Sequence, residues 1–454
     1  MIVARAFKGK KYCVLGLARS GMAVVETLLA SGAEVTVWDR REEPRRKLAG
    51  RTTIADPLEI PLVGYDAIIV SPGVPLNTHP IAEKARAAGV PVIGDIELFA
   101  RARPELPAHS VIGITGTNGK STTTALTYHL LQQAGVEARL GGNIGLPVLG
   151  EEPLGEGGVY VFELSSFQID LTRGLACEAA ALINISPDHL DRYDSFSDYA
   201  FAKGRLFAMQ GSWQFAVFGC DDASTSAVQQ AEASRRPESQ AVCVDTGAWA
   251  EHQGDWPSLQ GPHNLQNAAI AAALAESMGL TREQVLEGLA TFGGLPHRME
   301  RLGECDGVLF VNDSKATNAA STAPALAAYP PEREGKPRIH WICGGLAKED
   351  NLDDCEPHFR KVAKAYTIGE AGPMFAGLLE PHMKVERCEL LAEAVRRAVD
   401  NAGAGDVILL SPACASFDQF RDYEARGEAF REIATELGCK NLSGVPAFDT
   451  RSAA

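Results

Sequence analysis

The amino-acid sequence predicts an α/β protein of about three domains, each built on a mainly parallel sheet. Apolar runs typical of strands alternate with helical runs along the chain, and this alternation predicts parallel sheets with helices on both faces. A length of 454 residues, at about 150 residues per domain, indicates three domains. We place their bounds at residues 1–98, 99–302 and 303–454.

The composition excludes several classes of protein. A net charge of −15 argues against a nucleic-acid-binding surface, which needs a basic face, so local cations and backbone N–H groups must hold any anionic ligand. The ten cysteines form no C-x-x-C pair, and the closest two, Cys343 and Cys355, are twelve positions apart. This spacing disfavours a zinc ribbon or a disulfide framework and fits a reducing cytosol. No run reaches the ~20 apolar residues of a membrane span, and the N-terminus does not resemble a signal peptide. We therefore expect a soluble, cytoplasmic protein.

The first block begins like a nucleotide-binding fold. A strand at 12–15 leads into the glycine-containing loop 16–21 and a helix, and a second strand at 34–38 ends at Asp39. This is close to the dinucleotide-binding fingerprint, in which an acidic residue follows the loop by about 20 positions. Ala18 stands where the fingerprint has its middle glycine, which disfavours a plain nicotinamide dinucleotide site.

The next strand of this block, at 67–70, ends in the small loop 71–73. Ligands of open α/β sheets bind at the carboxyl ends of the strands, where both loops are expected to lie. By themselves these residues fit either a site for a nucleotide-type ligand or a Rossmann-like domain with a purely structural role.

The second block contains the most informative segment of the chain, the glycine-rich loop 113–121. An apolar run at 110–112 precedes it and a helical run at 122–133 follows it, which is the strand–loop–helix context of a triphosphate-binding loop. Glycines let backbone N–H groups turn toward phosphate oxygens, Lys120 can neutralise β- and γ-phosphate charge, and Ser121 can hold Mg²⁺. Gly119 follows Gly113 by six positions rather than the five of the strict pattern, so a glycine-rich turn before an ordinary helix is the alternative.

Two strand ends in this block carry candidate metal ligands. A strand at 160–163 ends on the carboxylate of Glu163, which can bind a divalent cation beside a triphosphate loop. The next apolar run, at 179–185, is followed by His189. A histidine beside a turn is usually a surface residue, but close to Glu163 it becomes a candidate for a second metal ligand.

Two further residues have ordinary structural interpretations when taken alone. Asn267 lies near the start of an alanine-rich helix, where asparagine usually serves as a cap. Lys203 lies in the segment 201–205, fourteen residues after His189, and taken alone it is interpreted as a solvated lysine.

In the third block, three strands end in polar loops. Strands at 308–311, 339–343 and 407–410 precede loops that contain hydroxyl groups and lysines. If the sheet is parallel, these loops lie at one edge. Each polar residue could also be a helix N-cap, an interpretation that is weaker for the three loops together.

These motifs together resemble the Mur ligase family of peptidoglycan synthesis over nearly the full length of the chain. Segments 115–121, 162–168 and 188–192 and the pair at 297–298 are similar to family motifs and occur in the family's order. The segment 410–420 is similar to that of the members that add D-glutamate.

The resemblance implies a Rossmann-like N-terminal domain that binds a UDP-sugar, a central P-loop-type ATPase domain, and a Rossmann-like C-terminal domain that binds an amino acid. It implies an ATP-dependent ligase that adds D-glutamate to UDP-N-acetylmuramoyl-L-alanine through an acyl phosphate, giving ADP and phosphate. The expected setting is cytoplasmic peptidoglycan precursor synthesis, and hence cell-wall formation, cell shape and cell division. Activation by phosphate is chemically reasonable, because a carboxylate is a poor electrophile and phosphoryl transfer needs mainly positioning and charge neutralisation.

The expected cofactors are ATP, two Mg²⁺ ions and CO₂, the last as a carbamate on Lys203. A protonated lysine would be repelled by a magnesium pair, whereas a neutral amine can add CO₂ and become an anion that suits the site. The expected partners are the two small-molecule substrates, with no nucleic acid and no membrane span, and the protein is expected to be a monomer.

The resemblance also assigns residues to roles. The catalytic set is Lys120, Glu163, His189 and Lys203, and the metal ligands are Ser121, Glu163, His189 and carbamylated Lys203. The ATP-binding residues are Gly116, Thr117, Asn118, Gly119, Lys120, Ser121, Thr122, Asn267, Arg298, Asp313 and Lys315. The UDP-substrate set is Ser20, Asp39, Arg40, Gly73 and Asn143, and the D-glutamate set is Thr317, Lys348 and Ser416. Ala18 departs from the glycine that is usual in these members, which puts the fit of the uridine diphosphate to this loop in doubt.

Three other functions stay open at this point. A sister ligase or a folylpolyglutamate-type synthase would share the central domain and add a different amino acid. A nucleotide-dependent sensor of UDP-sugars would turn over ATP without regard to an acceptor. A nicotinamide dehydrogenase fused to an ATPase would bind NAD, which Ala18 disfavours.

Overall fold

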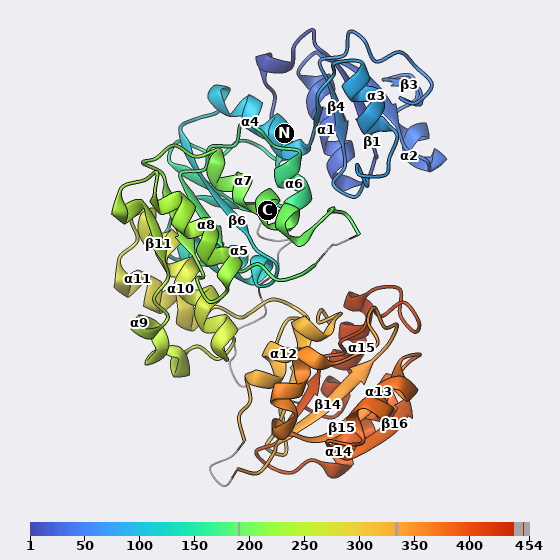
Figure 1. Ribbon diagram of the computed structural model, residues 1–454, viewed down its shortest axis with the longest axis vertical. Helices are drawn as coiled ribbons and strands as arrows, with labels where there is room; N and C mark the ends of the chain where they lie inside the picture. Colours follow the sequence, from blue (N-terminus) through green and yellow to red (C-terminus); the bar gives the residue numbers. More distant parts are fainter. Residues whose placement is uncertain (189–190, 332–334, 440–447, 449–454) are drawn as a thin grey trace. The chain divides into compact units, whose positions relative to one another are not determined.

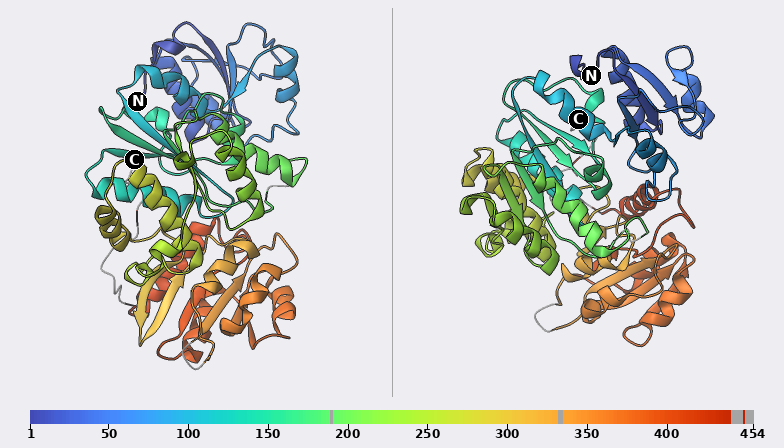
Figure 2. Two further views of the ribbon diagram at one scale, coloured as in Figure 1. Left: turned by 60° about the vertical axis from the view of Figure 1, so that its left-hand side comes forward. Right: turned by 45° about the horizontal axis from the view of Figure 1, so that its top comes forward.

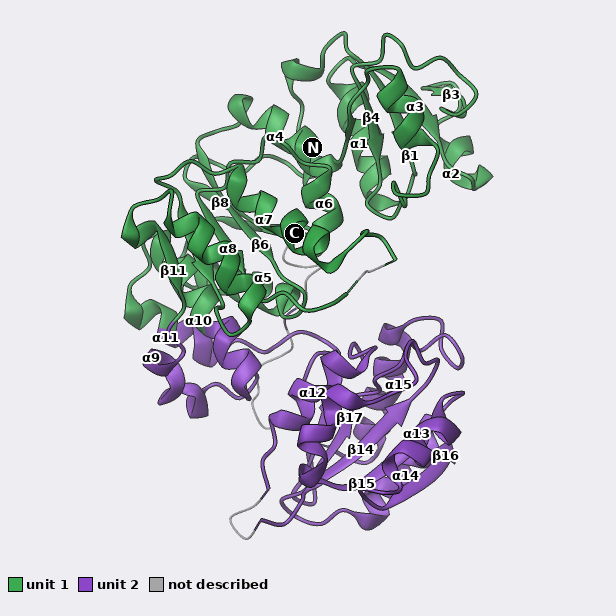
Figure 3. Cartoon of the chain, viewed as in Figure 1, with its two compact units in different colours: residues 1–244, 269–285, 450–454 green, residues 245–268, 286–449 purple. Residues whose placement is uncertain are grey.

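The computed structural model describes residues 1–188, 191–331, 335–439 and 448. It divides into two compact units (Figure 3). Unit 1 contains residues 1–244 and 269–285, and unit 2 contains residues 245–268 and 286–449. Each unit is described by itself below. In the part of the chain that the structure describes, no helix is both long and apolar enough to cross a membrane.

Unit 1 contains two sheets, of which the first is built from N-terminal strands that are all parallel (Figure 1). Its order is β3-β2-β1-β4-β5, so β1 lies in the middle and chain order reverses at β1. The strands are β1 (Lys11–Leu15), β2 (Glu34–Trp38), β3 (Thr53–Ile54), β4 (Ala67–Val70) and β5 (Val92–Ile93), and the helices are α1 (Arg19–Ala30), α2 (Glu42–Lys47), α3 (Ile81–Ala87) and α4 (Asp95–Ala102).

The second sheet of unit 1 is also wholly parallel, in the order β11-β10-β9-β6-β8-β7. Its strands are β6 (His109–Thr115), β7 (Ala138–Gly142), β8 (Gly158–Glu163), β9 (Ala179–Leu182), β10 (Phe215–Phe218) and β11 (Ala241–Cys243). Its helices are α5 (Lys120–Gln133), α6 (Ser166–Asp170), α7 (Phe196–Ala208) and α8 (Ala223–Ala233), and α10 (Pro262–Ser277) and α11 (Arg282–Thr291) each contain residues of both units. The central strand β6 is buried along most of its length, which agrees with an apolar run that has helices on both sides.

The sheet of unit 2 has the order β12-β13-β17-β14-β15-β16. It is parallel except for its edge strand β12, which pairs antiparallel with β13. The strands are β12 (Glu300–Cys305), β13 (Val308–Asn312), β14 (Ile339–Gly344), β15 (Val362–Ile368), β16 (Val385–Glu389) and β17 (Val407–Leu410), and the helices are α9 (Gly247–Ala250), α12 (Ala319–Ala327), α13 (Gly372–Leu379), α14 (Leu391–Asn401) and α15 (Tyr423–Glu436).

Two hydrophobic clusters lie on opposite faces of this sheet, because side chains of a strand alternate between its faces. Trp341 and Leu409 pack with α12 and α13 on one face. Ile342 and Leu410 pack with α14 and α15 on the other. Figures 1 and 2 show these helices around the strands of unit 2. Burial on both faces explains why these strands read as continuous apolar runs.

The fold class predicted from the sequence is confirmed: the three sheets are mainly parallel and alternate with helices. The main differences are local. The apolar run 179–185 is a strand only as far as Leu182, and the next residues pair with the glycine-rich loop instead. A disulfide joins Cys220 and Cys243, a pair that spacing along the chain did not suggest, whereas Cys343 and Cys355 are free and buried. The bounds predicted for the three domains stay a prediction.

Candidate active site

The glycine-rich loop of unit 1 connects the buried strand β6 to helix α5 as the sequence predicts. Gly116 and Gly119 have φ values of +157° and +83°, and Gly119 takes the left-handed conformation directly before α5. A side chain at Gly116 would come within 3.0 Å of Ile183, so this position is closed to larger residues. The loop therefore brings backbone N–H groups and the N-terminus of α5 to the carboxyl edge of the sheet, where an anion is favoured.

The segment after β9 fixes the conformation of this loop. The Thr117 N–H donates to the Asn184 carbonyl oxygen at 2.9 Å, and the Asn118 N–H donates to Asn184 Oδ1 at 2.8 Å. The Ser186 N–H donates to Thr117 Oγ1 at 3.0 Å. Because β9 neighbours β6 in the sheet, the chain that leaves β9 holds the loop from the side.

Two lysine side chains meet at one carbonyl oxygen of the loop. Lys120 Nζ donates to the Gly116 oxygen at 3.0 Å, and Lys203 Nζ of α7 donates to the same oxygen at 2.8 Å. Lys203 is only 1% exposed and lies over the ring of Tyr199. Burial lowers the pKa of Lys203 well below its ordinary value, and the nearby Lys120 ammonium lowers it further. A lowered pKa increases the share of the neutral, nucleophilic amine, whereas the sequence alone predicts a solvated cation at Lys203.

Glu163 lies at the end of β8 and is 1% exposed. Asn143 Nδ2 donates to its Oε1 at 2.8 Å, whereas Glu163 Oε2 is buried with no hydrogen-bond partner among the described residues. Thr115 Oγ1, at the end of the adjacent strand β6, is a second such orphan. Unsatisfied buried oxygens are costly, and two at one sheet edge suit a bound cation and its ligands.

The residues at this edge fit Mg²⁺ that is completed by phosphate oxygens. Ser121 is almost wholly buried in the first turn of α5, which begins at the same sheet edge as the Glu163 carboxylate, and a hydroxyl is an oxygen ligand that Mg²⁺ accepts. No cluster of three or more His, Cys, Asp or Glu that could hold a metal exists among the described residues. His189, the predicted second-metal ligand, lies outside the described residues.

The first sheet brings most of the predicted UDP-substrate residues to one edge. The loops after β1 and β4 meet where chain order reverses, and Ser71 Oγ donates to the Gly16 oxygen at 3.2 Å. Ligands of open parallel sheets bind at such reversal points. Ser20 lies in the first turn of α1, and Arg40 and Gly73 are exposed at the same edge.

Asp39 at the end of β2 has a structural role at this edge. Its carboxylate accepts from the Leu17 N–H at 2.7 Å and from the Arg41 N–H at 2.9 Å. Burial favours a higher pKa for Asp39, but these hydrogen bonds outweigh it and lower the pKa. Ala18 has φ −73°, a conformation open to any residue, so the missing glycine imposes no strain on the backbone here. Asn143 belongs to the second sheet, where its main contact is with Glu163.

In unit 2, the predicted nucleotide-binding Asp313 is buried directly after β13. Ser411 Oγ donates to its Oδ2 at 2.7 Å, and the Met299 N–H donates to its Oδ1 at 3.1 Å. Burial raises the pKa of Asp313 to about 7, against the opposing effect of these hydrogen bonds and of the cations Arg298 and Arg426.

Three more predicted ATP residues lie in unit 2. Arg298 lies between His297 and Met299, whose φ values of 61° and 48° mark a strained turn that is tied to Asp313. Lys315 Nζ lies 3.9 Å from the centre of the Tyr423 ring. Asn267 is inside helix α10 rather than at its cap, and its Nδ2 donates to Asn264 Oδ1 at 3.2 Å.

The predicted D-glutamate residues lie on loops that follow neighbouring strands of unit 2. Lys348 Nζ donates to Thr317 Oγ1 at 3.3 Å, and the Lys348 side chain is exposed. Leu346 and Ala415 exchange backbone hydrogen bonds of 2.9 and 3.0 Å, which attaches the loop of Ser416 beside that of Lys348. Ser416 itself is buried. The three residues therefore share one sheet edge, as their position after parallel strands predicts.

Sequence reasoning missed several residues that organise these sites. Asn184 and Tyr199 support the phosphate loop, and Arg426 of α15 donates to backbone oxygens of Ser314, Cys414 and Ala415. Arg426 is buried, and burial lowers its pKa to about 10. The signal for Asn184 is a polar residue within an apolar run, but nothing in the sequence marks a helical arginine as buried.

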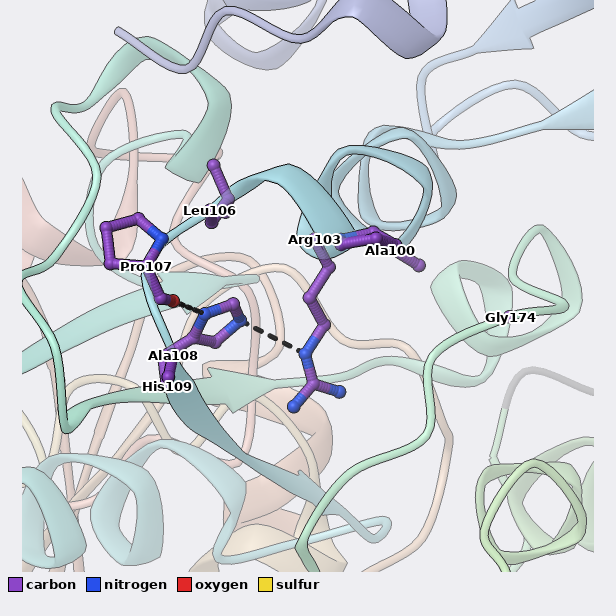
Figure 4. A pocket seen from close by; sticks show the side chains of 8 residues that line it. Ala100, Arg103, Leu106, Pro107, Ala108, His109 and Gly174 are labelled. Carbon is purple, nitrogen blue, oxygen red and sulfur yellow. Dashed lines mark hydrogen bonds between the residues drawn. The ribbon is translucent and has the colours of Figure 1, made fainter.

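A separate cavity of about 360 Å³ lies beside the segment 103–109 (Figure 4). Its only cationic side chain, Arg103, donates to His109 Nε2 at 3.0 Å and to both carboxylate oxygens of Glu178 at 2.7 and 2.6 Å. The guanidinium charge is already paired, so this cavity does not form an anion site.

Three family patterns match the chain. The N-terminal domain of MurD-like Mur ligases matches residues 10–94, the Mur ligase middle domain matches residues 114–275, and the glutamate ligase domain of Mur ligases matches residues 297–414. Their order is the one that the sequence motifs predict.

Curated proteins of high identity cover almost the whole chain. The chain is 65% identical to the UDP-N-acetylmuramoylalanine--D-glutamate ligase of Novosphingobium aromaticivorans, over 96% of this chain and 97% of that protein. It is 56% identical to the protein of the same name from Sphingopyxis alaskensis, over 96% of this chain and 100% of that protein.

Solved structures share the fold at much lower identity. The MurF ligase of Thermotoga maritima, determined with ADP, has a TM-score of 0.58 at 16% identity and covers 96% of each chain. UDP-N-acetylmuramate-alanine ligase from the same organism has a TM-score of 0.53 at 18% identity, over 94% of this chain and 99% of that one.

Proposed function

The chain belongs to the Mur ligase family, and from this we infer that it is an ATP-dependent ligase that joins D-glutamate to UDP-N-acetylmuramoyl-L-alanine. The products are the extended UDP-sugar peptide, ADP and phosphate. The 65% identity to a curated D-glutamate ligase over 96% of the chain supports the choice of amino acid within the family. The reaction is a step of peptidoglycan synthesis.

The structural observation that best supports this function is the phosphate loop beside an orphaned carboxylate oxygen. Lys120 and the N-terminus of α5 supply positive charge for the β- and γ-phosphates. Ser121 and Glu163 would hold Mg²⁺, because Glu163 Oε2 is buried and has no partner among the described residues. Bound there, Mg²⁺ would neutralise charge between the γ-phosphate and the approaching carboxylate.

In the proposed reaction the carboxylate of UDP-N-acetylmuramoyl-L-alanine attacks the γ-phosphorus of ATP, and ADP leaves. The amine of D-glutamate then attacks the acyl carbon of the resulting acyl phosphate, and phosphate leaves. The Lys120 ammonium lies in the phosphate loop, where it can stabilise the negative charge on the phosphoryl group during transfer. The hydrogen bonds of Thr117 and Asn118 to Asn184 keep the N–H groups of the loop in place. The contribution of the chain is thus positioning and charge neutralisation rather than covalent catalysis.

We further propose that Lys203 acts as a carbamate. Its burial and lowered pKa favour the neutral amine that adds CO₂, and its contact with the Gly116 oxygen holds it beside the phosphate loop. The resulting anion would help to hold a second Mg²⁺, together with His189. Carbamylation would turn the Lys203 side chain into an anion, which would attract the Lys120 ammonium instead of being disfavoured by it in the protonated form.

The substrate sites follow from the two remaining edges. The UDP moiety would bind where the β1 and β4 loops meet, near Ser20, Arg40 and Gly73, with Asp39 holding the loops together. D-glutamate would bind near Thr317, Lys348 and Ser416, where Lys348 can pair with a carboxylate. Arg298, Asp313, Lys315 and Asn267 would contact the adenine nucleotide. The use of ATP and a UDP-sugar fits a cytoplasmic monomer that contributes to wall synthesis and cell division.

Phosphate release with UDP-N-acetylmuramoyl-L-alanine as acceptor, measured against a panel of D- and L-amino acids, tests this function. We expect turnover with D-glutamate at least tenfold above that with any other amino acid. Preference for another amino acid would indicate a sister ligase or a folylpolyglutamate-type synthase. ATP turnover that is independent of any acceptor would indicate a sensor.

A further inference from the structure

A disulfide closes the outer edge of the ATP-binding sheet. It joins Cys220, two residues after β10, to Cys243, the last residue of β11, with 5.6 Å between the Cα atoms. Strand β11 has three residues and lies at the edge, where it pairs only with β10. Cys243 is exposed and Cys220 is half-buried, so small molecules in solution can reach the pair.

The other eight cysteines are in less reactive surroundings. Six of them are buried, and burial raises the pKa of Cys13, Cys177 and Cys355 to about 12. Cys305 and Cys439 are half-buried, and the pKa of Cys439 is also raised to about 12. Because the thiolate is the reactive form, the thiols whose pKa is raised react slowly at neutral pH.

The disulfide adjoins the backbone that supports the phosphate loop. Directly before Cys220, the Gly219 N–H donates to the Leu182 oxygen of β9 at 3.0 Å. Two residues after Cys220, Asp222 Oδ2 accepts from the Ile185 N–H at 3.1 Å, while Asp222 also caps α8. Both hydrogen bonds therefore fix the segment between β9 and the candidate magnesium site.

The same segment holds the phosphate loop directly, because Ile185 lies between two residues that bond to it. Asn184 accepts from the N–H groups of Thr117 and Asn118, and Ser186 donates to Thr117. A movement of residues 219–222, the Cys220 turn, would thus be transmitted to the phosphate loop. It would act first through the hydrogen bonds to the segment 182–185, and then through those of Asn184 and Ser186 to the loop.

We propose that Cys220 and Cys243 are a reversible oxidation site at which a low-molecular-weight disulfide, such as oxidised glutathione, closes the edge of the ATP-binding sheet. In the reduced protein, the three-residue strand β11 is held mainly by its pairing with β10 and opens easily, as short edge strands do. Oxidation suppresses this opening and so keeps the Cys220 turn, Ile185 and the phosphate loop in place. The consequence for ATP binding rests on the proposed ligase function, but the oxidation itself does not.

The exchange is balanced without any other reactant. The thiolate of the more exposed Cys243 attacks one sulfur of the small disulfide, which forms a mixed disulfide and releases one thiolate. The Cys220 thiolate then attacks the Cys243 sulfur and releases the second. One disulfide is broken and one is formed, and the two protons lost by the protein thiols are taken up by the two released thiols.

The test uses the full-length chain in two states, fully reduced and treated with oxidised glutathione. After denaturation and alkylation, peptide mass mapping should find one linked peptide pair that contains Cys220 and Cys243, with the other eight cysteines alkylated. The oxidised protein should unfold about 5–10 °C higher than the reduced protein, since the bond closes a loop of 23 residues. Hydrogen exchange at the Ile185 and Thr117 amides should be slower by at least about threefold in the oxidised state.

Two variants sharpen the comparison. Cys220→Ser should lose the difference between the two states, whereas the matched control Cys305→Ser should keep it. If Cys220→Ser does not fold, Cys243→Ser and the two states of the unsubstituted chain provide the same comparison. A different cysteine pairing, no linked peptide, or equal unfolding temperatures and exchange rates in the two states would overturn the proposal. Because none of these readouts needs turnover, they remain informative if the ligase assignment fails.

Discussion

The substitution Lys203→Met separates catalysis from stability at the centre of the site. Methionine keeps the length of the side chain but removes the amine, which is 1% exposed and lies near the Lys120 ammonium. The Gly116 oxygen loses its 2.8 Å bond from Lys203 but keeps the 3.0 Å bond from Lys120. We expect turnover to fall by at least about 100-fold while the folded state becomes more stable.

The size of the stability change follows from two opposing effects. Loss of one hydrogen bond costs about 1 kcal/mol, whereas methionine removes the cost of burying an ionisable amine, for which the replacement of buried charged groups by apolar side chains, commonly about 1–4 kcal/mol, gives the scale. The net gain of about 1–2 kcal/mol raises Tm by roughly 3–6 °C. Lys203→Ala also loses buried volume, so its free energy of unfolding should be about 2–3 kcal/mol lower than that of Lys203→Met. The two variants should lose turnover equally.

The lowered pKa of Lys203 makes the free energy of unfolding depend on pH. The folded state disfavours the Lys203 proton that an unfolded lysine keeps up to its ordinary pKa near 10.4, so the unsubstituted protein gains stability as pH rises toward 10. The difference in Tm between Lys203→Met and the unsubstituted protein should therefore become smaller as pH rises toward 10. Phosphate release at saturating substrates and thermal unfolding without nucleotide provide the measurements. Full turnover in Lys203→Met would show that the amine takes no part in the reaction, and a Tm below that of Lys203→Ala would show that burial of the amine does not cost stability.

Four further substitutions test other parts of the site. Glu163→Gln keeps an acceptor for Asn143 but removes the charge, so half-maximal Mg²⁺ should rise at least about tenfold in a magnesium titration; an unchanged value would remove Glu163 from the metal site. Burial raises the pKa of Asp313 to about 7, so the stability that its protonated form contributes is lost as pH rises from about 4 to 7. The Tm of Asp313→Asn should therefore exceed that of the unsubstituted protein by an amount that grows from pH 5 to 8. A constant difference in Tm would contradict this. Arg426→Lys loses the bidentate geometry of a buried guanidinium and should cost about 2–4 kcal/mol in urea unfolding, whereas a cost below about 0.5 kcal/mol would show that the loops do not depend on it. Lys348→Met should raise the KM for D-glutamate by about 10–100-fold and leave that for ATP nearly unchanged; equal changes in both would argue against a D-glutamate contact.

The fold was largely accessible from the sequence because strand ends and glycine loops are local signals. The strands β2, β4 and β17 begin and end at the predicted residues, since each is an apolar run closed by a polar or small residue. The end of β9 was misjudged because Ile183 and Ile185 continue the apolar run, although Asn184 between them bonds to the phosphate loop. Apolar character alone cannot distinguish a sheet hydrogen bond from a loop contact.

The site was predictable in composition but not in detail. The position of Glu163 at a strand end predicts a carboxylate at the sheet edge, but its unpartnered Oε2 appears only in three dimensions. The lowered pKa of Lys203 depends on burial by residues far apart in the chain, which no local pattern encodes. The Cys220–Cys243 bond cannot be predicted from a local pattern either, because its two cysteines are 23 residues apart and are brought together by neighbouring strands.

The central claim is that ATP activates the carboxylate of the UDP-sugar substrate before the amine attacks. UDP-N-acetylmuramoyl-L-alanine labelled with ¹⁸O in its terminal carboxylate tests this claim directly, in the presence of ATP, Mg²⁺ and D-glutamate. An acyl phosphate predicts that each phosphate released carries one ¹⁸O atom, since attack at the acyl carbon breaks the carbon–oxygen bond. Ligated product accompanied by phosphate without ¹⁸O would show that no acyl phosphate forms.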